Sequence, residues 1–408
     1  MKTIYLDDCA STMTDPKVVK AMMPYFSQFY GNASSTHDMG MKSKIALNDA
    51  RHIIAKAIGA KDEEIYFTSG GTESNNLALK GAAMAEAIRA GKAMKEKKAA
   101  ASGKGVGKKE FRNHIITTNV EHSCILNSCK WLEEMGFTVT YLDVDAEGFV
   151  RLEDFKKAIT DQTFLVSIIH ANNEIGTIND LKTIGAICRK KGILLHTDAC
   201  QSFTKVPIDV MKMNIDMMTL NSHKIHGPKG VGALYVRKGI ELVPILHGGG
   251  HEHGLRSGTE NIPGIVGFGE AVRLAKSGYV KDMIKLRDMF IDAVLEAVPD
   301  AVLNGPRDRG GSSKRTCNNV NITFPVSGEM LGDYLGFAGI CTSKGSACAS
   351  NESGAELSHV LKAIGRTDKQ IKNSIRFSVS RFTTKKEIEE TIKVLLKSVD
   401  KTRKSKYA

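Results

Sequence analysis

Lys224 stands where a lysine has no evident structural reason to be. It lies in Asn-Ser-His-Lys-Ile-His-Gly-Pro-Lys-Gly, residues 221–230, directly after the apolar run 216–220. A lysine held in a pocket at such a position loses its proton readily and can form a Schiff base with a carbonyl compound. For this motif taken alone, an ordinary exposed loop lysine is the alternative.

Asp198 follows another apolar run, Gly-Ile-Leu-Leu-His-Thr, residues 192–197. A carboxylate buried there loses its hydration and needs a cation or several hydrogen-bond donors in return. A protonated ligand nitrogen would be such a partner, and a cap of the following helix is the alternative.

Glycines and hydroxyl side chains gather in residues 69–74, Ser-Gly-Gly-Thr-Glu-Ser, ahead of a helical pattern. Backbone N–H groups at a helix start are unpaired and the helix dipole is positive there, so Gly71 and Thr72 are candidates for phosphate binding. A plain helix cap is the alternative. The segment is neither a Walker A loop nor a Gly-x-Gly-x-x-Gly motif, which argues against nucleoside triphosphates and dinucleotides.

Together these motifs predict a site for pyridoxal phosphate. Asp198 would keep the pyridine nitrogen protonated, Lys224 would hold the aldehyde, and residues 69–74 would anchor the phosphate. His122 follows the β-branched run 114–118 and is in position to stack on the ring, although alone it would be taken for a core or surface histidine.

Cys348 lies among small polar residues, Thr-Ser-Lys-Gly-Ser-Ala-Cys-Ala-Ser, residues 342–350. Such flanks leave a thiol exposed and mobile, as a nucleophile requires, and an inert loop cysteine is the alternative. We interpret the other seven cysteines as mainly structural. No Cys-x-x-Cys pair occurs, which favours a reducing compartment.

The elements that must position these residues belong to an α/β fold. Apolar runs alternate with helical patterns, which predicts a mostly parallel sheet flanked by helices, with ligands beyond the carboxyl ends of its strands. We expect a large domain over 15–262 and a smaller α+β domain over 1–14 and 263–408. Strands are predicted at 64–68, 114–118, 138–142, 163–170, 193–197, 217–220, 231–236, 319–324 and 374–379, and helices at 284–297 and 385–396.

The composition, 42% hydrophobic and 25% charged over 408 residues, is typical of a soluble globular protein. No apolar run could span a membrane and no leader is visible, so we expect a cytoplasmic protein, or an organelle-matrix one if a leader is missing from this chain. Segments 89–112 and 397–408 carry net charges of +7 and +4 out of +12 overall. The first is interpreted as a solvated linker. The alternative is an electrostatic docking site for an acidic partner or a polynucleotide, although we do not expect nucleic-acid binding.

In combination and order, these motifs resemble the cysteine desulfurases, class V members of the fold-type I enzymes that depend on pyridoxal phosphate. The resemblance runs from YLDDCASTMTDPKV to RFSVSRFTTKKEIEE and omits only residues 89–112 and the basic tail. Between them lie TSGGTESNN, EHSCI, HANNEIGTI, HTDACQS, SHKIHGPKG, LRSGTEN and GSACAS.

The resemblance implies roles for matching residues. Lys224 would bind the cofactor covalently and act as base, Asp198 would pair with the ring nitrogen, and His122 would stack on the ring. Gln201 would bind the ring hydroxyl. The phosphate would be bound by Gly71, Thr72, His223 and Asn221, together with Thr259 of the partner subunit. Asn173 and Arg376 would bind the substrate carboxylate. The family usually has serine where Asn221 stands, so we expect altered, not lost, cofactor affinity.

The implied reaction removes sulfur from L-cysteine, giving L-alanine and a persulfide on Cys348. The sulfur would pass to an acceptor protein such as an iron–sulfur scaffold, or serve tRNA thiolation, and the active form would be a homodimer. The alternatives are a selenocysteine lyase, another class V enzyme, or a noncatalytic sulfur-carrier or nucleic-acid-binding scaffold. No metal site is expected, although three histidines lie close together in HGGGHEHG: His247, His251 and His253.

Overall fold

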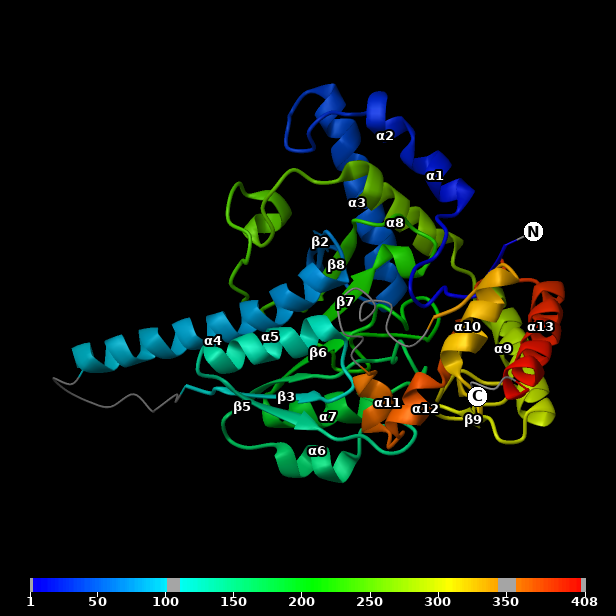
Figure 1. Cartoon of the computed structure of the whole chain (residues 1–408). Helices are drawn as coiled ribbons and strands as arrows, with labels where there is room; N and C mark the ends of the chain where they lie inside the picture. Colours follow the sequence, from blue (N-terminus) through cyan, green and yellow to red (C-terminus); the bar gives the residue numbers. More distant parts are fainter. Residues whose placement is uncertain (1–2, 101–110, 344–356, 405–408) are drawn as a thin grey trace.

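The computed structural model describes residues 3–100, 111–343 and 357–404, with side chains described up to residue 91 and again from residue 111. A central sheet is covered by helices, and a second group of helices and strands lies beside it (Figure 1). In the described part of the chain, no helix is long and apolar enough to cross a membrane.

The central sheet has seven strands in the order β2-β8-β7-β6-β5-β3-β4. Their neighbours pair in parallel except at β8, which is antiparallel to both β2 and β7. The predicted mostly parallel sheet is therefore confirmed. In sheet order the strands are β2 (Ile65–Thr68), β8 (Gly232–Val236), β7 (Met217–Asn221), β6 (Leu194–Asp198), β5 (Thr163–Ser167), β3 (His114–Thr118) and β4 (Thr138–Leu142).

Helices cover both faces of this sheet. Successive residues of a strand point to opposite faces, so neighbouring residues pack against different helices. Ile115 and Met217 pack with α4 (Gly71–Ala100) and α5 (Ser123–Glu134). Their neighbours Ile116 and Met218 pack with the helices of the other face, α3 (Asp38–Ile58), α6 (Leu152–Ala158), α7 (Leu181–Lys191) and α8 (Ile262–Leu274).

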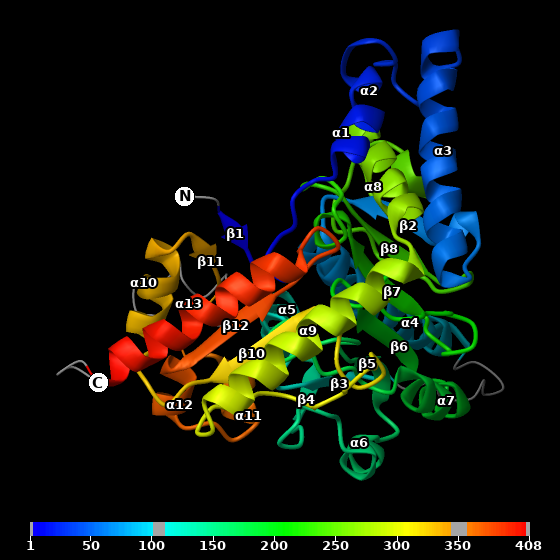
Figure 2. The ribbon, with the colours of Figure 1, turned by 90° about the vertical axis from the view of Figure 1, so that its right-hand side faces the viewer.

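A smaller antiparallel sheet has β10 (Asn319–Thr323) between β9 (Val302–Leu303) and β12 (Ser374–Ser378). Figure 2 shows α9 (Ser277–Ala297) and α13 (Lys385–Arg403) side by side over it, and α10 (Gly328–Phe337) packs against α13. The first strand, β1 (Ile4–Tyr5), pairs in parallel with β11 (Ile340–Cys341), so the start of the chain joins this group.

The predicted domain boundaries stay predictions, although two packing facts bear on them. Ile4 and Leu6 belong to the buried cluster of the smaller sheet, whereas the buried residues of α8 pack with those of α3. The remaining elements are α1 (Pro16–Met22), α2 (Pro24–Ser27), α11 (His359–Ala363), α12 (Asp368–Lys372) and the 3-10 turns η1 (Asp62–Glu64), η2 (Ser222–Lys224) and η3 (His251–Gly254).

The linker interpretation of segment 89–112 is wrong for its first half. Helix α4 continues through this basic stretch to Ala100, and only residues 101–110 lie outside the described residues. Residues 89–100 consist mainly of Ala, Lys, Met, Glu and Arg, which have high helix propensities. Charged and small residues in this stretch therefore did not indicate the absence of regular structure.

Candidate active site

A cavity of about 210 Å³ opens where β6 and β7 end and α4 begins. This is the position expected for a ligand in an open α/β sheet. Ten of the twelve predicted site residues line it: Gly71, Thr72, His122, Asn173, Asp198, Gln201, Asn221, His223, Lys224 and Arg376. Thr259 is exposed and does not line the cavity of its own chain, and Cys348 lies outside the described residues.

Lys224 ends the 3-10 turn η2 that follows β7, and it is partly buried. Its amine Nζ donates to the carbonyls of Cys9 and Ala10, at 2.6 Å each. Burial lowers the pKa of this amine below its usual range. A lysine in this environment is a better base and nucleophile than an exposed one. Lys224 therefore differs from an ordinary exposed loop lysine.

Asp198 is the last residue of β6 and only 6% exposed. One carboxylate oxygen accepts from Asn75 Nδ2 at 2.7 Å, and the other accepts from the backbone N–H of Cys200 at 2.9 Å. Gln201, in the turn that follows, donates from Nε2 to the carbonyl of Cys9 at 2.9 Å. The carboxylate thus has neutral donors but no cation among the described hydrogen-bond partners, which suits a protonated ligand nitrogen.

Gly71 is the first residue of α4, and the crowding around it leaves no room for a side chain. A Cβ there would lie 2.8 Å from Cys200 Sγ and 3.3 Å from Asn221 Nδ2. Thr72 follows in the first turn, where unpaired N–H groups and the helix dipole favour an anion. Both residues line the cavity, as an anion cradle requires.

His223 and Asn221 complete this end of the cavity. Asn221 accepts from the backbone N–H of His223 at 3.3 Å, and His223 Nδ1 lies 3.2 Å from Ser11 Oγ. Burial and then the neighbouring Lys224 lower the pKa of His223 to about 3. The imidazole is therefore neutral near pH 7 and offers a hydrogen bond to an anion instead of a charge.

His122 caps the N-terminus of α5. Its Nδ1 accepts from the backbone N–H of Cys124 at 3.2 Å and lies 3.0 Å from Cys124 Sγ. The preceding Glu121 is fully buried, and this burial raises its pKa to about 8. The cap fixes the imidazole at the wall of the cavity, in keeping with the predicted stacking role.

Arg376 and Asn173 lie together at the side of the cavity nearest the smaller sheet. Arg376 belongs to β12 and donates from Nη1 to the carbonyl of Asn173 at 3.1 Å. Its Nη2 lies 3.0 Å from Asp7 Oδ1. The predicted carboxylate-binding pair is therefore brought together, with an acidic neighbour that was not predicted.

Sequence reasoning missed several residues that contact these side chains, among them Asp7, Cys9, Ala10 and Asn75. Cys9 and Ala10 line the cavity, Asp7 contacts Arg376, and Asn75 donates to Asp198. For the residues near the N-terminus, the sequence signal was the small, polar run that follows the short strand. No periodicity links that run to a lysine more than two hundred residues later.

Both ends of the segment that contains Cys348 are attached close to the cavity. Ser343 exchanges two backbone hydrogen bonds with Arg376, at 3.1 and 2.8 Å. On the other side, Ser358 Oγ donates to the carboxylate of Glu174.

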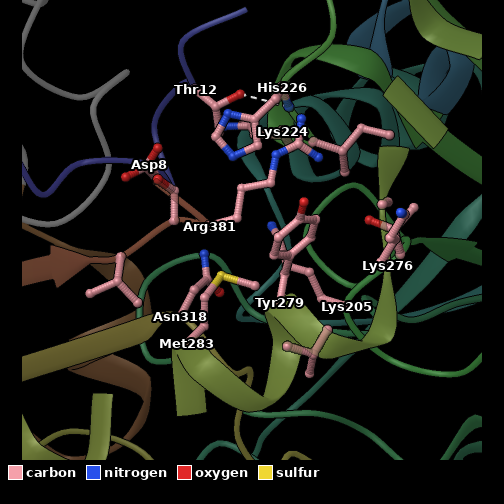
Figure 3. Close-up of a pocket in the computed structure, with 16 residues that line it drawn as sticks. Asp8, Thr12, Lys205, Lys224, His226, Lys276, Tyr279, Met283, Asn318 and Arg381 are labelled. Atoms are coloured by element: carbon pink, nitrogen blue, oxygen red, sulfur yellow. Dashed lines mark hydrogen bonds between the residues drawn. The ribbon is translucent and has the colours of Figure 1, made fainter. Parts of the chain in front are cut away.

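Lys224 also lines a second cavity, shown in Figure 3 with Asp8 and Asn318 on one side and Tyr279 and Lys276 on the other. Its wall is largely apolar. Asp8 Oδ2, Lys205 Nζ and Asn318 Oδ1 are buried here without a hydrogen-bond partner in the described part of the chain. Burial raises the pKa of Asp8 to about 7, against the opposing effect of Lys205.

The residues of the first cavity fit pyridoxal phosphate. Lys224 supplies a buried amine, Asp198 a carboxylate and Gly71 the start of a helix. Two buried polar atoms at this cavity, Asn75 Oδ1 and Arg376 Nε, have no hydrogen-bond partner among the residues described. Buried polar atoms are rarely left unpaired, so both point to a ligand with donor and acceptor groups. By contrast, no three His, Cys, Asp or Glu side chains in the described residues are grouped as metal ligands.

Comparison with known proteins agrees with this geometry. The family model of class V aminotransferases matches residues 4–391. The cysteine desulfurase IscS of Methanosarcina thermophila is 44% identical over 406 residues, which cover 98% of this chain and 93% of the relative. The same protein from Rickettsia bellii is 44% identical over 407 residues, with 98% and 92% covered.

A solved NifS-like protein superposes with a TM-score of 0.84 at 34% identity, covering 98% of this chain and all of that one. Because the family model spans nearly the whole chain and the relatives align over more than nine-tenths of their length, the chain belongs to the class V aminotransferase family.

Proposed function

We propose that the protein is a pyridoxal phosphate-dependent cysteine desulfurase, which converts L-cysteine to L-alanine and leaves the sulfur as a persulfide on Cys348. The observation that carries this proposal is the meeting of a buried amine, a buried carboxylate and a buried guanidinium in one cavity: Lys224, Asp198 and Arg376. The relatives named as cysteine desulfurases support it, as does a solved structure titled SspA in complex with cysteine, which is 37% identical with a TM-score of 0.77 over 94% of this chain and all of that one.

Each end of the cavity offers groups for one part of the cofactor. When bound, pyridoxal phosphate supplies an electron sink for the substrate carbon. Asp198 would hold the ring nitrogen and Gln201 the ring hydroxyl, while His122 would lie against the ring. The phosphate would be bound by the start of α4 with Gly71, Thr72, Asn221 and His223, joined by Thr259 of the partner subunit.

The substrate would be bound through its carboxylate by Arg376 and Asn173, since a guanidinium binds a carboxylate with two hydrogen bonds. The amine of Lys224, with its lowered pKa, would accept the proton from the substrate Cα. The thiolate of Cys348 would then attack the substrate sulfur. The carbon–sulfur bond breaks as the sulfur–sulfur bond forms, and the carbon is reprotonated to give alanine.

Two further features of the proposal concern assembly and partners. A homodimer is favoured by the exposure of Thr259 away from its own cavity and by large apolar side chains exposed around α2 and α3, among them Met23, Phe26, Tyr30 and Ile45. The sulfur acceptor would be a protein such as an iron–sulfur scaffold, and the location would be the cytoplasm. Light scattering of the purified protein tests the dimer directly.

The test of the activity compares the intact protein with Cys348→Ala and Lys224→Ala. Incubation of the wild type with L-cysteine should release alanine, and mass spectrometry should find one added sulfur on the peptide that contains Cys348. Cys348→Ala should retain the yellow bound cofactor but form no persulfide. Lys224→Ala should lose both the cofactor's covalent attachment and the reaction.

Full desulfurase turnover by Cys348→Ala would remove that residue as the nucleophile. A protein that remains colourless with added cofactor would favour a noncatalytic scaffold instead. Turnover with L-selenocysteine but not with L-cysteine would favour the selenocysteine lyase, and formation of a keto acid would favour an aminotransferase.

A further inference from the structure

The guanidinium of Arg376 is held by an acidic residue at the other end of the chain. Its Nη2 lies 3.0 Å from Asp7 Oδ1, and its Nη1 donates to the carbonyl of Asn173 at 3.1 Å. Arg376 is 1% exposed, and its Nε has no hydrogen-bond partner among the described residues. Two of the three guanidinium nitrogens are thus fixed by the chain itself.

The backbone fixes the position of Asp7 relative to this arginine. Asp7 forms a parallel bridge with Ser378 of β12, two residues beyond Arg376. Ser378 donates its N–H to the carbonyl of Leu6 at 2.8 Å, and Cys9 donates its N–H to Ser378 Oγ at 2.8 Å. The carboxylate therefore has a set direction and does not sample the surface as a free side chain would.

The same short segment also holds Lys224. The carbonyls of Cys9 and Ala10 each accept from its Nζ at 2.6 Å. Lys224 follows a strand of the central sheet, whereas Arg376 lies in the smaller sheet. Residues 7–10 are thus a direct link between the two groups that must act on one substrate molecule.

We propose that Asp7 is a positioning residue that orients Arg376 for the carboxylate of an α-amino acid substrate. The inference rests on the proposed function for the identity of that substrate. Asp7 does not touch the ligand; its charge-assisted hydrogen bond keeps the guanidinium in one orientation before the ligand arrives. A carboxylate then binds to a preorganised partner and loses less affinity to the ordering of a long side chain.

The test measures ligand binding to the cofactor-loaded enzyme by calorimetry, with L-alanine as an amino acid that has no sulfur to transfer. Asp7→Ala should raise the Kd for L-alanine about tenfold, the usual effect of losing a hydrogen bond to a charged group. Asp7→Asn keeps an acceptor oxygen and should raise it less. Cysteamine, which has the amine and thiol of cysteine but no carboxylate, should bind all variants with the same Kd.

The matched control is Asp8→Asn, which removes an acidic group from the same segment without touching Arg376 and should leave both Kd values unchanged. In turnover assays, Asp7→Ala should raise KM for L-cysteine and change kcat by less than about twofold. Unchanged or tighter L-alanine binding in Asp7→Ala overturns the proposal, and so does equal weakening for cysteamine, which indicates general damage. A wild type that binds L-alanine but does not desulfurate L-cysteine would contradict the proposed function alone.

Discussion

Lys224 lines two cavities, and the buried charged groups of the two differ in their hydrogen-bond partners. In the first cavity, Asp198 accepts two hydrogen bonds from neutral donors and has no cation paired with it among the described residues. In the second, Asp8 and Lys205 are buried in a largely apolar wall without a hydrogen-bond partner for Asp8 Oδ2 or Lys205 Nζ in the described chain. The amine of Lys224 donates hydrogen bonds to the carbonyls of Cys9 and Ala10, which line the first cavity.

The contrast shows that enclosure alone does not identify a site. The first cavity combines fixed charges with a helix start and several neutral donors, so a polar ligand finds partners over its whole length. The second also contains unpaired buried polar atoms, on Asp8, Lys205 and Asn318, but its Asp8 carboxyl group is opposed by the charge of Lys205 from its own chain. We therefore expect substitutions in the first cavity to change chemistry and substitutions in the second to change stability.

The largest effect should follow Asp198→Asn in the first cavity. Asn keeps one acceptor oxygen, so one of the two donors, Asn75 Nδ2 or the Cys200 N–H, loses its acceptor, and the charge opposite the ligand nitrogen is removed. Loss of one preorganised electrostatic group typically costs about 10²–10³ in kcat. Steady-state alanine formation measures this, and a melting temperature close to that of the wild type shows that the fold is retained.

An Asp198→Asn enzyme that retains most of its turnover would contradict the assignment of the chemistry to the first cavity. An Asp8→Asn enzyme, with the matching change in the second cavity, would contradict it as well if its reaction slowed to a similar extent. Both outcomes would mean that the two cavities do not divide chemistry from stability.

The next effect, on stability and with a size that depends on pH, is expected from Asp8→Asn. Burial raises the pKa of Asp8 to about 7 from 3.8, so the folded state binds a proton that the unfolded state has released. Stability therefore falls as pH rises from about 4 to 7 and does not recover above that range. Asn cannot ionise, so the variant should be more stable than the wild type at pH 8, by up to about 4 kcal/mol.

Urea unfolding at pH 4 and pH 8 measures this difference. The gain should be much smaller at pH 4, where Asp8 is protonated in the fold and only partly ionised in the unfolded chain. A variant that is equally stabilised at both values, or destabilised at pH 8, would show that Lys205 compensates the buried carboxylate and that the second cavity contains a working ion pair.

Much of the first cavity could be predicted because its chemistry follows the ends of strongly apolar strands. Asp198 and Lys224 each come directly after such a run, and neighbouring parallel strands bring their carboxyl ends to one edge. Local pattern was sufficient here because strand and loop are adjacent in sequence. The predicted strand 163–170 was too long, since β5 ends at Ser167 where the chain leaves the sheet.

The contribution of residues 7–10 could not be predicted in this way. Their contacts with Lys224 and Arg376 depend on the pairing of β1 with β11 and on the fit between two sheets, which no local periodicity encodes. The second cavity has the same origin, because Asp8 and Asn318 meet only after the two ends of the chain have been brought together.

Gly71→Ala should weaken cofactor binding in the first cavity. The new Cβ would lie 2.8 Å from Cys200 Sγ, so either this side chain or the first turn of α4 must shift, and both lie at the cavity. Overpacking of this kind costs roughly 1–3 kcal/mol, and we expect the Kd for pyridoxal phosphate to rise about tenfold. Gly91→Ala in the same helix has no atom within 4 Å of the new Cβ and is the matched control.

The control should leave cofactor affinity unchanged and stabilise the protein by about 0.5–1 kcal/mol, because alanine favours a helix over glycine. Titration of the cofactor-free protein, followed by absorbance, measures both affinities. If the two alanine variants bind the cofactor equally well, the start of α4 is not the phosphate end of the cavity.

The smallest effect should follow Asn221→Ser. The side-chain oxygen of Asn221 accepts from the N–H of His223, and a serine hydroxyl can take over this cap while also donating to a phosphate. Cofactor Kd should therefore change by less than about threefold, whereas Asn221→Ala, which loses the cap and the donor, should weaken binding by about 1 kcal/mol. The same absorbance titration separates the two, and a serine variant as weak as the alanine variant would show that the longer amide is itself needed to reach the phosphate.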